Sequence, residues 1–346
     1  MRSYLPSNVR HLSGVLKEVL LSRDAAAYSA LGRSVLGILL SPVDIALSPF
    51  EQKRYCGAGQ PQKPIIFVCG PPRSGTTLMQ QVLLQCCPLS YFNNLSAVFP
   101  RSPIIANEWF CKFIKKRTID FQSFYGHTRS LSGPNDGLHL WDRWVGEDRN
   151  FFPKHLKDNQ SAEHMRRFFA AWQAMSGRGI ITKNNRLNGF AHLIHPVLPG
   201  ALFLCMRRSP IDLAQSLLIA RKRITRDLGI PYGAVGAEYS SERIPNDPIA
   251  DVCRQVRHYE LIAAEQEANV GSEHFWVVPY ESFCLNPASW MERISARLNI
   301  TLDYKAVSNL PKLHPSAKNR LKIHELDYMK EILNSMDFPL SDHGLN

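Results

Sequence analysis

The sequence lacks a Cys-x-x-Cys pair and any spacing of cysteine and histidine typical of a zinc site, although it contains eight cysteines. Two of them, Cys69 and Cys205, lie inside apolar runs, where a thiol usually behaves as a small hydrophobic side chain. We therefore expect free, reduced cysteines and no metal site. Free cysteines favour a reducing compartment, so the expected location is the cytoplasm.

The chain also lacks a long uninterrupted hydrophobic run. Its first residues carry charges and a proline where a signal peptide would need an apolar stretch. The most apolar early segment, residues 34–50, contains Pro42, Asp44 and Pro49, and it falls short of the roughly 20 apolar residues of a bilayer span. We expect no export signal and no transmembrane segment. The segment is expected to be a packed helical arm, and a peripheral contact with a membrane surface stays open.

Internal repeats and low-complexity tracts are absent too, and 45% hydrophobic and 21% charged residues fit an ordinary globular protein. Collagen, coiled coil and wholesale disorder are thereby excluded. The 346 residues suit one large α/β domain with appendages. Lysine and arginine (41) outnumber aspartate and glutamate (30), which gives a net charge of +11 and favours an anionic partner. Nucleic acid, a membrane and a phosphorylated nucleotide all satisfy that condition.

The chain divides into three parts by composition. Residues 1–60 are expected to be a helical arm followed by a polar linker that begins at residue 51, residues 61–330 the main domain, and residues 331–346 a tail. Short apolar runs without alternation at residues 65–69, 179–182, 201–206 and 275–279 predict buried strands of a parallel sheet. The expected fold is α/β, with a central parallel sheet between two layers of helices. The turn-rich residues 226–248 predict a loop or lid.

A glycine-rich turn follows the first predicted strand. Residues 70–77 read GPPRSGTT, which matches the glycine spacing of a phosphate-binding loop, but Thr76 stands where nucleotide triphosphatases have a lysine. Arg73 supplies a cation inside the turn instead. The backbone amides of residues 74–77 and the start of the next helix still form a cradle for an anion. Anion binding is therefore expected, without the usual triphosphatase chemistry.

The strand at residues 201–206 is followed by two arginines. A magnesium-dependent triphosphatase would need a carboxylate at such a strand end to hold the metal. Here Arg207 and Arg208 stand at that place, and a helix with the hydroxyl of Ser216 follows. This arrangement suits a second phosphate group better than a metal ion.

The two motifs together resemble those of sulfotransferases that use 3'-phosphoadenosine 5'-phosphosulfate (PAPS). PPRSGTTL resembles the family's 5'-phosphosulfate loop, and the spacing of Arg208, Pro210, Asp212 and Ser216 resembles its 3'-phosphate motif. The resemblance covers roughly residues 62–325, including the late segment VVPYESFCLNP. It implies a P-loop-like fold, PAPS as co-substrate, and metal-independent transfer of a sulfuryl group.

The resemblance also implies roles for individual residues. Arg208 and Ser216 would bind the 3'-phosphate, and Lys183, after the strand at residues 179–182, would contact the transferring group. Lys318 and Arg320 lie where the family often closes a basic loop over the nucleotide. The residues that would bind the 5'-phosphosulfate are Arg73, Ser74, Gly75, Thr76 and Thr77.

The catalytic base does not follow from the family pattern. Asn184 and Asn185 follow Lys183, where some relatives have a histidine. The best remaining segment is HTRSLSGPNDGLHLWDRW, in which a turn places polar groups beside aromatic bulk. Asp136 and His139 are the candidate bases, with Asp136 favoured and with His127 next to test.

Two other classes of function stay open at this stage. One is a P-loop nucleotide kinase or phosphotransferase, and the other is a basic protein that binds nucleic acid or a membrane surface. The sulfotransferase interpretation is favoured and implies a small-molecule, glycan or lipid-like acceptor, with no nucleic-acid partner expected. The pocket segments, roughly residues 90–145 and 221–250, do not identify the acceptor or separate O-sulfation from N-sulfation.

Overall fold

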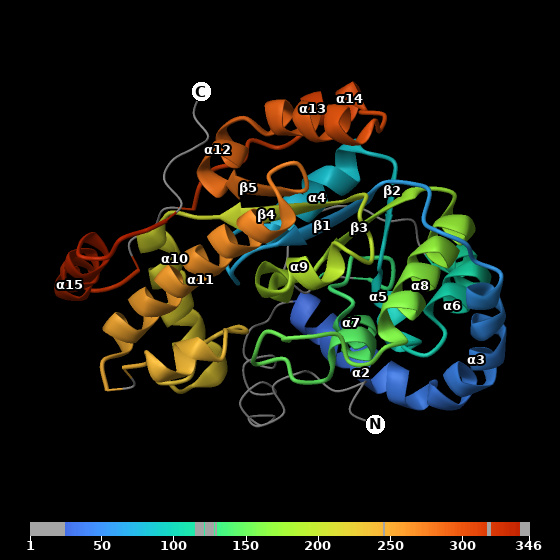
Figure 1. Cartoon of the computed structure of the whole chain (residues 1–346), viewed down its shortest axis with the longest axis horizontal. Coiled ribbons are helices and arrows are strands. Elements are labelled where there is room, and N and C mark those ends of the chain that lie inside the picture. Colours follow the sequence, from blue (N-terminus) through green and yellow to red (C-terminus); the bar gives the residue numbers. More distant parts are fainter. Residues whose placement is uncertain are drawn as a thin grey trace.

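The structure, a computed structural model, describes residues 25–114, 121, 128, 130–244, 246–316 and 320–339. Five parallel strands form its sheet in the order β2-β3-β1-β4-β5 (Figure 1). The strands are β1 (Ile65–Cys69), β2 (Leu89–Tyr91), β3 (Gly179–Lys183), β4 (Ala201–Arg207) and β5 (Phe275–Pro279). The predicted α/β fold with a central parallel sheet is confirmed. Four of the five strands are those expected from the unbroken apolar runs, and β2 was not predicted.

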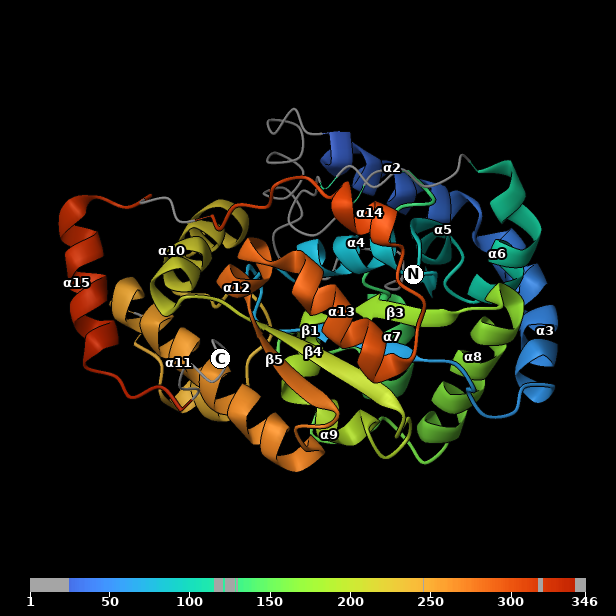
Figure 2. The ribbon, with the colours of Figure 1, turned by 90° about the horizontal axis from the view of Figure 1, so that it is seen from above.

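Helices cover both faces of the sheet, as Figures 1 and 2 show. The α-helices are α2 (Ala25–Leu39), α3 (Ser41–Cys56), α4 (Thr76–Cys86), α5 (Asn94–Val98), α6 (Pro103–Phe110), α7 (Leu138–Val145), α8 (Ser161–Ser176), α9 (Ala191–Ile194), α10 (Pro210–Ala220), α11 (Pro248–Val270), α12 (Tyr280–Leu285), α13 (Pro287–Leu298), α14 (Tyr304–Ser308) and α15 (Ile323–Asn334). Short single-turn elements are η3 (Cys111–Phe113), η4 (Asn185–Gly189), η5 (Arg221–Thr225) and η6 (Glu238–Ser241).

Alternate residues of β1 and β4 face two separate hydrophobic cores, as the two-residue period of a strand requires. Ile66 and Val68 of β1 face α4, α12 and α13. Ile65, Phe67 and Cys69 face the aromatic core built by α7 and α8, with α9 and α11 beside it. Both faces of the sheet are therefore buried, which explains why the strands carry apolar residues without alternation.

The N-terminal helices α2 and α3 pack on the main domain rather than standing apart from it. Asp44 of α3 accepts hydrogen bonds from the backbone amides of Arg101 and Ser102, and Glu51 accepts one from the amide of Ile105 at 2.9 Å. These carboxylates satisfy amides at the start of α6, where no helical partner exists. The expectation of a polar linker from residue 51 was wrong, because α3 continues to Cys56.

Other boundaries differ less from the expected ones. In the described part of residues 226–247, before α11 begins at Pro248, the only helical element is the short η6, as the turn-rich composition predicts. Helix α15 runs through residue 330, where the main domain was expected to end. The three-part division of the chain stays a prediction. No single described helix is long and apolar enough to cross a membrane, although the pair Leu31–Leu39 and Ser41–Cys56, bent by 72°, passes on length and composition when taken together.

Candidate functional site

The predicted binding residues meet at the carboxyl edge of the sheet. Strands β3 and β4 flank β1 on its two sides, so the loops that follow these three strands lie next to one another. After β1 the chain continues to β2 on one side of the sheet, whereas after β4 it continues to β5 on the other side. Ligands of open α/β sheets bind where the connections diverge in this way. The phosphate loop, residues 70–77, follows β1 and is flanked by the ends of the other two strands.

Two positions of the phosphate loop require glycine. At Gly70, with φ of 127°, an added Cβ would lie 2.5 Å from the carbonyl oxygen of Met206 in β4. At Gly75, with φ of 100°, it would lie 2.4 Å from Cδ2 of the Tyr280 ring. Only glycine adopts these conformations readily and permits such close approach. Helix α4 begins at Thr76, so its first backbone amides, which have no partners within the helix, surround the loop.

One side of the phosphate loop carries a chain of polar contacts that ends in an ion pair. Lys183 at the end of β3 donates a hydrogen bond to Oγ1 of Thr77 at 3.2 Å, and its Nζ lies 2.9 Å from Oδ1 of Asp136. The hydroxyl of Thr76 donates to Oδ1 of Asn185 at 3.0 Å. The side chain of Lys183 is only 3% exposed, whereas that of Asp136 is 31% exposed. The carboxylate of Asp136 is therefore accessible from solvent, whereas the ammonium of Lys183 is enclosed beside the loop.

The other side of the phosphate loop is joined to the motif after β4. Arg73, which has a positive φ of 74°, donates from Nε to the hydroxyl of Ser216 at 3.2 Å. Arg208 donates from Nη1 to the carbonyl oxygen of Arg73 at 2.9 Å and from Nη2 to that of Ser316. Two guanidinium groups and a hydroxyl thus gather at one flank of the loop. Ser74 takes no part in this cluster, because its hydroxyl donates to the carbonyl of Pro71.

Arg208 is a buried cation. Its guanidinium lies 5.2 Å from the centre of the Tyr280 ring, and its Nε has no hydrogen-bond partner. Burial lowers the pKa of this guanidinium. A buried charge without a full set of partners is costly, so an anion bound here would be stabilised.

Arg207, the neighbouring arginine, points elsewhere. Its Nε donates to Oε2 of Glu260 on α11 at 2.8 Å. Adjacent strand residues face opposite sides of a sheet, which separates the two arginines. The Tyr-Glu segment after β5 supports the chain that follows Arg208, since Glu281 accepts a hydrogen bond from the amide of Ser209 at 3.0 Å. Arg207 is thus a structural residue, and Arg208 is the one at the site.

The predicted basic loop is only partly described. The backbone amide of Arg320 donates to Oε1 of Gln215 on α10 at 3.1 Å, one residue before Ser216 in the chain. Arg320 therefore lies next to the cluster of Arg73 and Arg208. Lys318 lies outside the described residues.

A tight turn holds Asp136 in place. The preceding Asn135 donates from its side chain to Asn94 and from its backbone amide to the carbonyl of Phe92. Gly137 has φ of 63°, and a Cβ there would lie 2.7 Å from Cδ2 of Phe92. The turn is therefore fixed against the chain that follows β2, and it presents Asp136 to Lys183.

His139, the second candidate base, is buried on α7. Burial and the nearby guanidinium groups of Arg143 and Arg149 lower the pKa of its imidazole to about 3. The ring atom Nε2 has no hydrogen-bond partner. A neutral imidazole with so low a pKa is a weak proton acceptor, because a general base works best near the operating pH. His127 lies outside the described residues.

The segment from residue 226 to residue 244 packs over the phosphate loop. A Cβ added at Gly233 would lie 2.3 Å from Cγ of Pro72, so the backbone of Gly233 lies directly against the Pro72 ring. Side chains of α11 hold this segment by its backbone. Gln255 donates to the carbonyl of Tyr232, Tyr259 donates to that of Ala234, and Nε2 of His258 accepts from the amide of Gly236.

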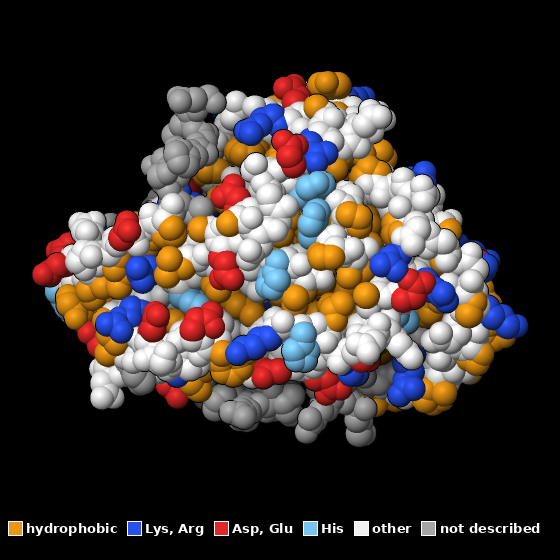
Figure 3. Space-filling model, viewed as in Figure 1, with side chains coloured by type: hydrophobic (Ala, Val, Ile, Leu, Met, Phe, Trp, Pro, Cys, Tyr) orange, Lys and Arg blue, Asp and Glu red, His pale blue; other side chains and the backbone are white. Residues whose placement is uncertain are grey.

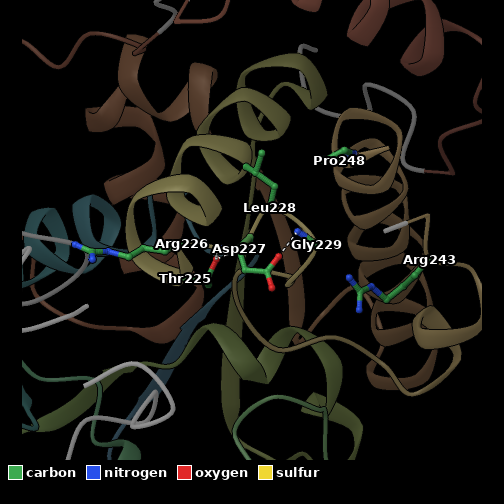
Figure 4. A pocket seen from close by; sticks show the side chains of 7 residues that line it. All are labelled: Thr225, Arg226, Asp227, Leu228, Gly229, Arg243 and Pro248. Atoms are coloured by element: carbon green, nitrogen blue, oxygen red, sulfur yellow. Dashed lines mark hydrogen bonds between the residues drawn. The ribbon is translucent and has the colours of Figure 1, made fainter. Parts of the chain in front are cut away.

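A buried ion pair fastens both ends of the same segment. Arg221 donates to Oδ2 of Asp251 at 2.6 Å and to the carbonyl of Leu228 at 3.0 Å, while Oδ1 of Asp251 accepts from the amide of Ile244 at 2.9 Å. Both charged side chains are fully buried. A hollow of about 750 Å³ lies between the two ends of this segment and the start of α11. Figure 4 shows Arg243 and Pro248 on one side of it and Thr225 to Gly229 on the other. None of these residues belongs to the phosphate loop or to the Arg208 cluster, so the hollow is not the anion site.

The comparisons with known proteins agree with this geometry. Residues 64–304 match the sulfotransferase family. This chain is a member of the sulfotransferase family. A comparison with curated proteins finds no match. Among solved structures, the fold is similar to that of sulfotransferase STF1 from Mycobacterium tuberculosis H37Rv, with 16% identity, a TM-score of 0.53, and coverage of 95% of this chain and 93% of that one.

A second similar structure is sulfotransferase STF9 from Mycobacterium avium, with 15% identity, a TM-score of 0.54, and coverage of 98% of this chain and 92% of that one. At these identities the likeness concerns the fold. The P-loop-like α/β fold that the family resemblance implies is thereby confirmed.

The residues around the phosphate loop fit a nucleotide with phosphate groups at two positions. Guanidinium, ammonium, hydroxyl and backbone amide groups all donate to anions, and the buried Nε of Arg208 still lacks an acceptor. Within the described part of the chain, no group of three or more His, Cys, Asp or Glu side chains could hold a metal ion.

Three contributors to the site were not predicted from the sequence. Asn185 bonds Thr76, Tyr280 packs on Gly75 and Arg208, and Gln215 bonds the chain at Arg320. Asn185 has a signal in the sequence, since it follows Lys183 by two residues at a strand end. Tyr280 has one too, because it begins the Tyr-Glu segment of the family resemblance.

Proposed function

We propose that this sulfotransferase transfers a sulfuryl group from PAPS to a hydroxyl or amine of a small-molecule, glycan or lipid-like acceptor, without a metal ion. The observation that carries the proposal is the junction of Arg73, Arg208 and Ser216 beside the phosphate loop. Arg208 and Ser216 would form a second anion site on the flank of the loop away from Thr77 and Lys183, and Arg73, which contacts both residues, would join it to the loop. A nucleotide that carries a phosphate on its 3' position and a phosphosulfate on its 5' position would use both anion sites.

When bound, PAPS would supply an activated sulfuryl group on a phosphate leaving group. The chain's own residues then have three tasks. The amides at the start of α4 and the guanidinium of Arg73 would hold the anion and stabilise the charge that develops on it. Lys183, directed at Thr77, would add positive charge on the same side. Asp136 would take the proton of the acceptor, for which its partial exposure is suited.

Nucleotide binding tests the donor assignment. Titration calorimetry should show that adenosine 3',5'-bisphosphate binds at least tenfold more tightly than AMP, because a charge-assisted contact contributes roughly 1.5 to 3 kcal/mol. The adjacent arginines offer a matched pair of variants. Arg208→Lys should reduce the preference for the bisphosphate, whereas Arg207→Lys should leave it intact, since Arg207 pairs with Glu260. Equal affinity of the wild-type protein for both nucleotides would remove the basis of the assignment.

Turnover tests the assignment of the base. With labelled PAPS and a panel of acceptors, Asp136→Asn should lower kcat by roughly 100-fold or more. Asp148→Asn is the matched control, because Asp148 is an exposed turn aspartate that accepts from the amide of Asn150. Retention of wild-type kcat in Asp136→Asn, together with its loss in His139→Gln, would transfer the role to His139.

The alternative of a P-loop phosphotransferase makes the opposite prediction about metal. Thr76 replaces the lysine of that class, and the end of β4 carries arginines instead of a carboxylate. Sulfuryl transfer is therefore expected to persist in excess EDTA. Loss of turnover on chelation that magnesium restores, or turnover of ATP, would favour the alternative.

A further inference from the structure

Helices α2 and α3 expose an almost purely apolar face. Leu39 at their junction is 69% exposed, and large apolar side chains before and after it are also exposed. On α2 they follow the spacing i, i+3, i+4, which places them on one side of the helix. The exposed large apolar side chains of the two helices between residues 35 and 50 are Val35, Ile38, Leu39, Val43, Ile45 and Phe50.

The two charged residues between positions 33 and 50, Arg33 and Asp44, point into the protein. Arg33 donates from Nη1 to the carbonyl oxygen of Thr128 at 3.0 Å, and Asp44 accepts from the amide of Ser102 at 2.9 Å. Asp44 is the one charged residue between positions 34 and 50 of the sequence. The outward side of this stretch therefore carries no charge at all, which is unusual for the surface of a protein that stays in water.

The apolar face continues onto α6 and η3. The rings of Phe50 and Trp109 lie 5.6 Å apart, and Trp109 is exposed beside α3. Phe113, a few residues further, is 78% exposed. We define the apolar face as Val35, Ile38, Leu39, Val43, Ile45, Phe50, Trp109 and Phe113.

Basic side chains border the apolar face. The ammonium of Lys53 lies 5.8 Å from the centre of the Phe50 ring, and that of Lys112 lies 5.2 Å from the centre of the Phe113 ring. The nearby Glu108 is paired with Arg54 at 2.5 Å, so its charge is compensated. Figure 3 shows hydrophobic and basic side chains side by side at the edge of the molecule where Figure 1 places α3.

We propose that this face docks the protein onto the surface of an anionic lipid bilayer. Exposed aliphatic side chains would enter the boundary of the acyl chains, and aromatic rings such as Trp109 favour the interfacial region. The border of Lys53 and Lys112 complements anionic headgroups. A second copy of this chain fits less well, because a two-fold contact through the same face would bring the two basic borders together.

The helices would lie on the membrane rather than cross it. The side of α3 opposite to the apolar face is attached to the protein, since Asp44 and Glu51 bond backbone amides of α6 and its preceding turn. The pair of helices is also bent by 72°. Only the outward side is therefore free to contact lipid. Because Arg33 bonds Thr128, whose hydroxyl donates to Pro134, docking would bring the turn of Asp136 close to the membrane.

Vesicle binding of the full chain tests the proposal. Flotation with vesicles of phosphatidylcholine and phosphatidylglycerol should recover the protein, and vesicles of phosphatidylcholine alone should recover at least tenfold less. Added salt should weaken the binding, as screening of headgroup attraction requires. Failure to bind the anionic vesicles would overturn the proposal.

Variants locate the contact. Ile38→Ser combined with Ile45→Ser should lower the vesicle partition at least tenfold, since each side chain would lose its burial in lipid. The matched control is Leu285→Ser combined with Ile323→Ser, because these residues are 77% and 80% exposed but lie outside the apolar face. Thermal melting of both variants checks that they are folded. An equal effect of the two pairs would refute the location.

A charge variant and a measurement of molecular mass distinguish docking on an anionic membrane from contact with a second copy of the chain. Lys53→Glu combined with Lys112→Glu should abolish the preference for phosphatidylglycerol while the apolar residues stay in place. In sedimentation velocity the wild-type protein without lipid should be monomeric. A dimer that Ile38→Ser and Ile45→Ser dissociate would identify a second copy as the occupant and overturn the membrane proposal.

Discussion

Replacing Asp251 by asparagine should destabilise the protein strongly, because it removes the only counter-charge bonded to a fully buried guanidinium within the described structure. Arg221 and Asp251 are both 0% exposed and lie 2.6 Å apart. Breaking a buried pair by removing one partner typically costs about 3 to 5 kcal/mol, since the other charge stays buried. Against a total stability of roughly 5 to 15 kcal/mol, this is a large loss.

Urea unfolding followed by tryptophan fluorescence measures the effect. The control is Glu108→Gln, which breaks the exposed pair with Arg54 and should cost less than about 1 kcal/mol. A double variant, Asp251→Asn with Arg221→Gln, should lose less than the sum of its single variants, because the unpaired charge is gone. Destabilisation by Asp251→Asn no larger than that of the control would refute the reasoning.

The same substitution should also affect nucleotide binding. Asp251 holds the amide of Ile244, and Arg221 holds the carbonyl of Leu228, so the pair fixes the segment whose Gly233 touches Pro72 of the phosphate loop. Looser attachment of that segment should raise the Kd for adenosine 3',5'-bisphosphate in protein that is still folded. An unchanged Kd would show that the segment does not support the loop.

Two further predictions concern the loop and a buried histidine. Gly75→Ala should abolish nucleotide binding in calorimetry, because its Cβ would clash with Tyr280. The control is Gly146→Ala, at φ of 85° with open space around it, which should cost only the backbone strain of about 1 to 3 kcal/mol and should retain nucleotide binding. His139 has a folded pKa of about 3, below its unfolded value near 6.5, so stability should fall as pH drops below about 6.5, by about 2 kcal/mol at pH 5. The fall in the free energy of unfolding between pH 7 and pH 5 should be smaller in His139→Gln than in the wild-type protein. Urea unfolding at the two pH values measures this fall for each protein, and an equal fall in both would contradict the prediction.

Four of the five strands were predictable because a strand that is buried on both faces consists of apolar residues without alternation. The apolar runs around Phe67 and Phe203 contain no polar residue, and each became a strand of the sheet. Strand β2 has three residues, Leu89–Tyr91, and such a length gives no period to detect. The start of α4 was predictable as well, since the glycine-rich turn ends where a helix with buried Val82 begins.

Individual residues of the candidate site were predictable from the sequence, but the contacts between them were not. Lys183 ends an apolar strand, and the edge of a parallel sheet collects such residues, so its position follows from the sequence. Its partner Asp136 lies 47 residues earlier in a turn that Phe92 and Asn94 hold through backbone and side-chain contacts. Contacts of that kind depend on packing between distant segments, and no local pattern reports them.

The ion pair of Lys183 and Asp136 predicts a coupling between donor and acceptor sites. A lysine side chain that is 3% exposed needs a counter-charge for its ammonium, and Asp136 supplies it. An anionic nucleotide on the phosphate loop would offer a second counter-charge to the same ammonium. Asp136→Asn should therefore melt at a lower temperature than wild type without nucleotide, yet gain more from saturating adenosine 3',5'-bisphosphate, because the bound anion restores what the substitution removed. Asp148→Asn should gain as much as wild type. Differential scanning fluorimetry with and without the nucleotide measures these shifts, and an equal or smaller gain for Asp136→Asn would show that Lys183 does not face the bound anion.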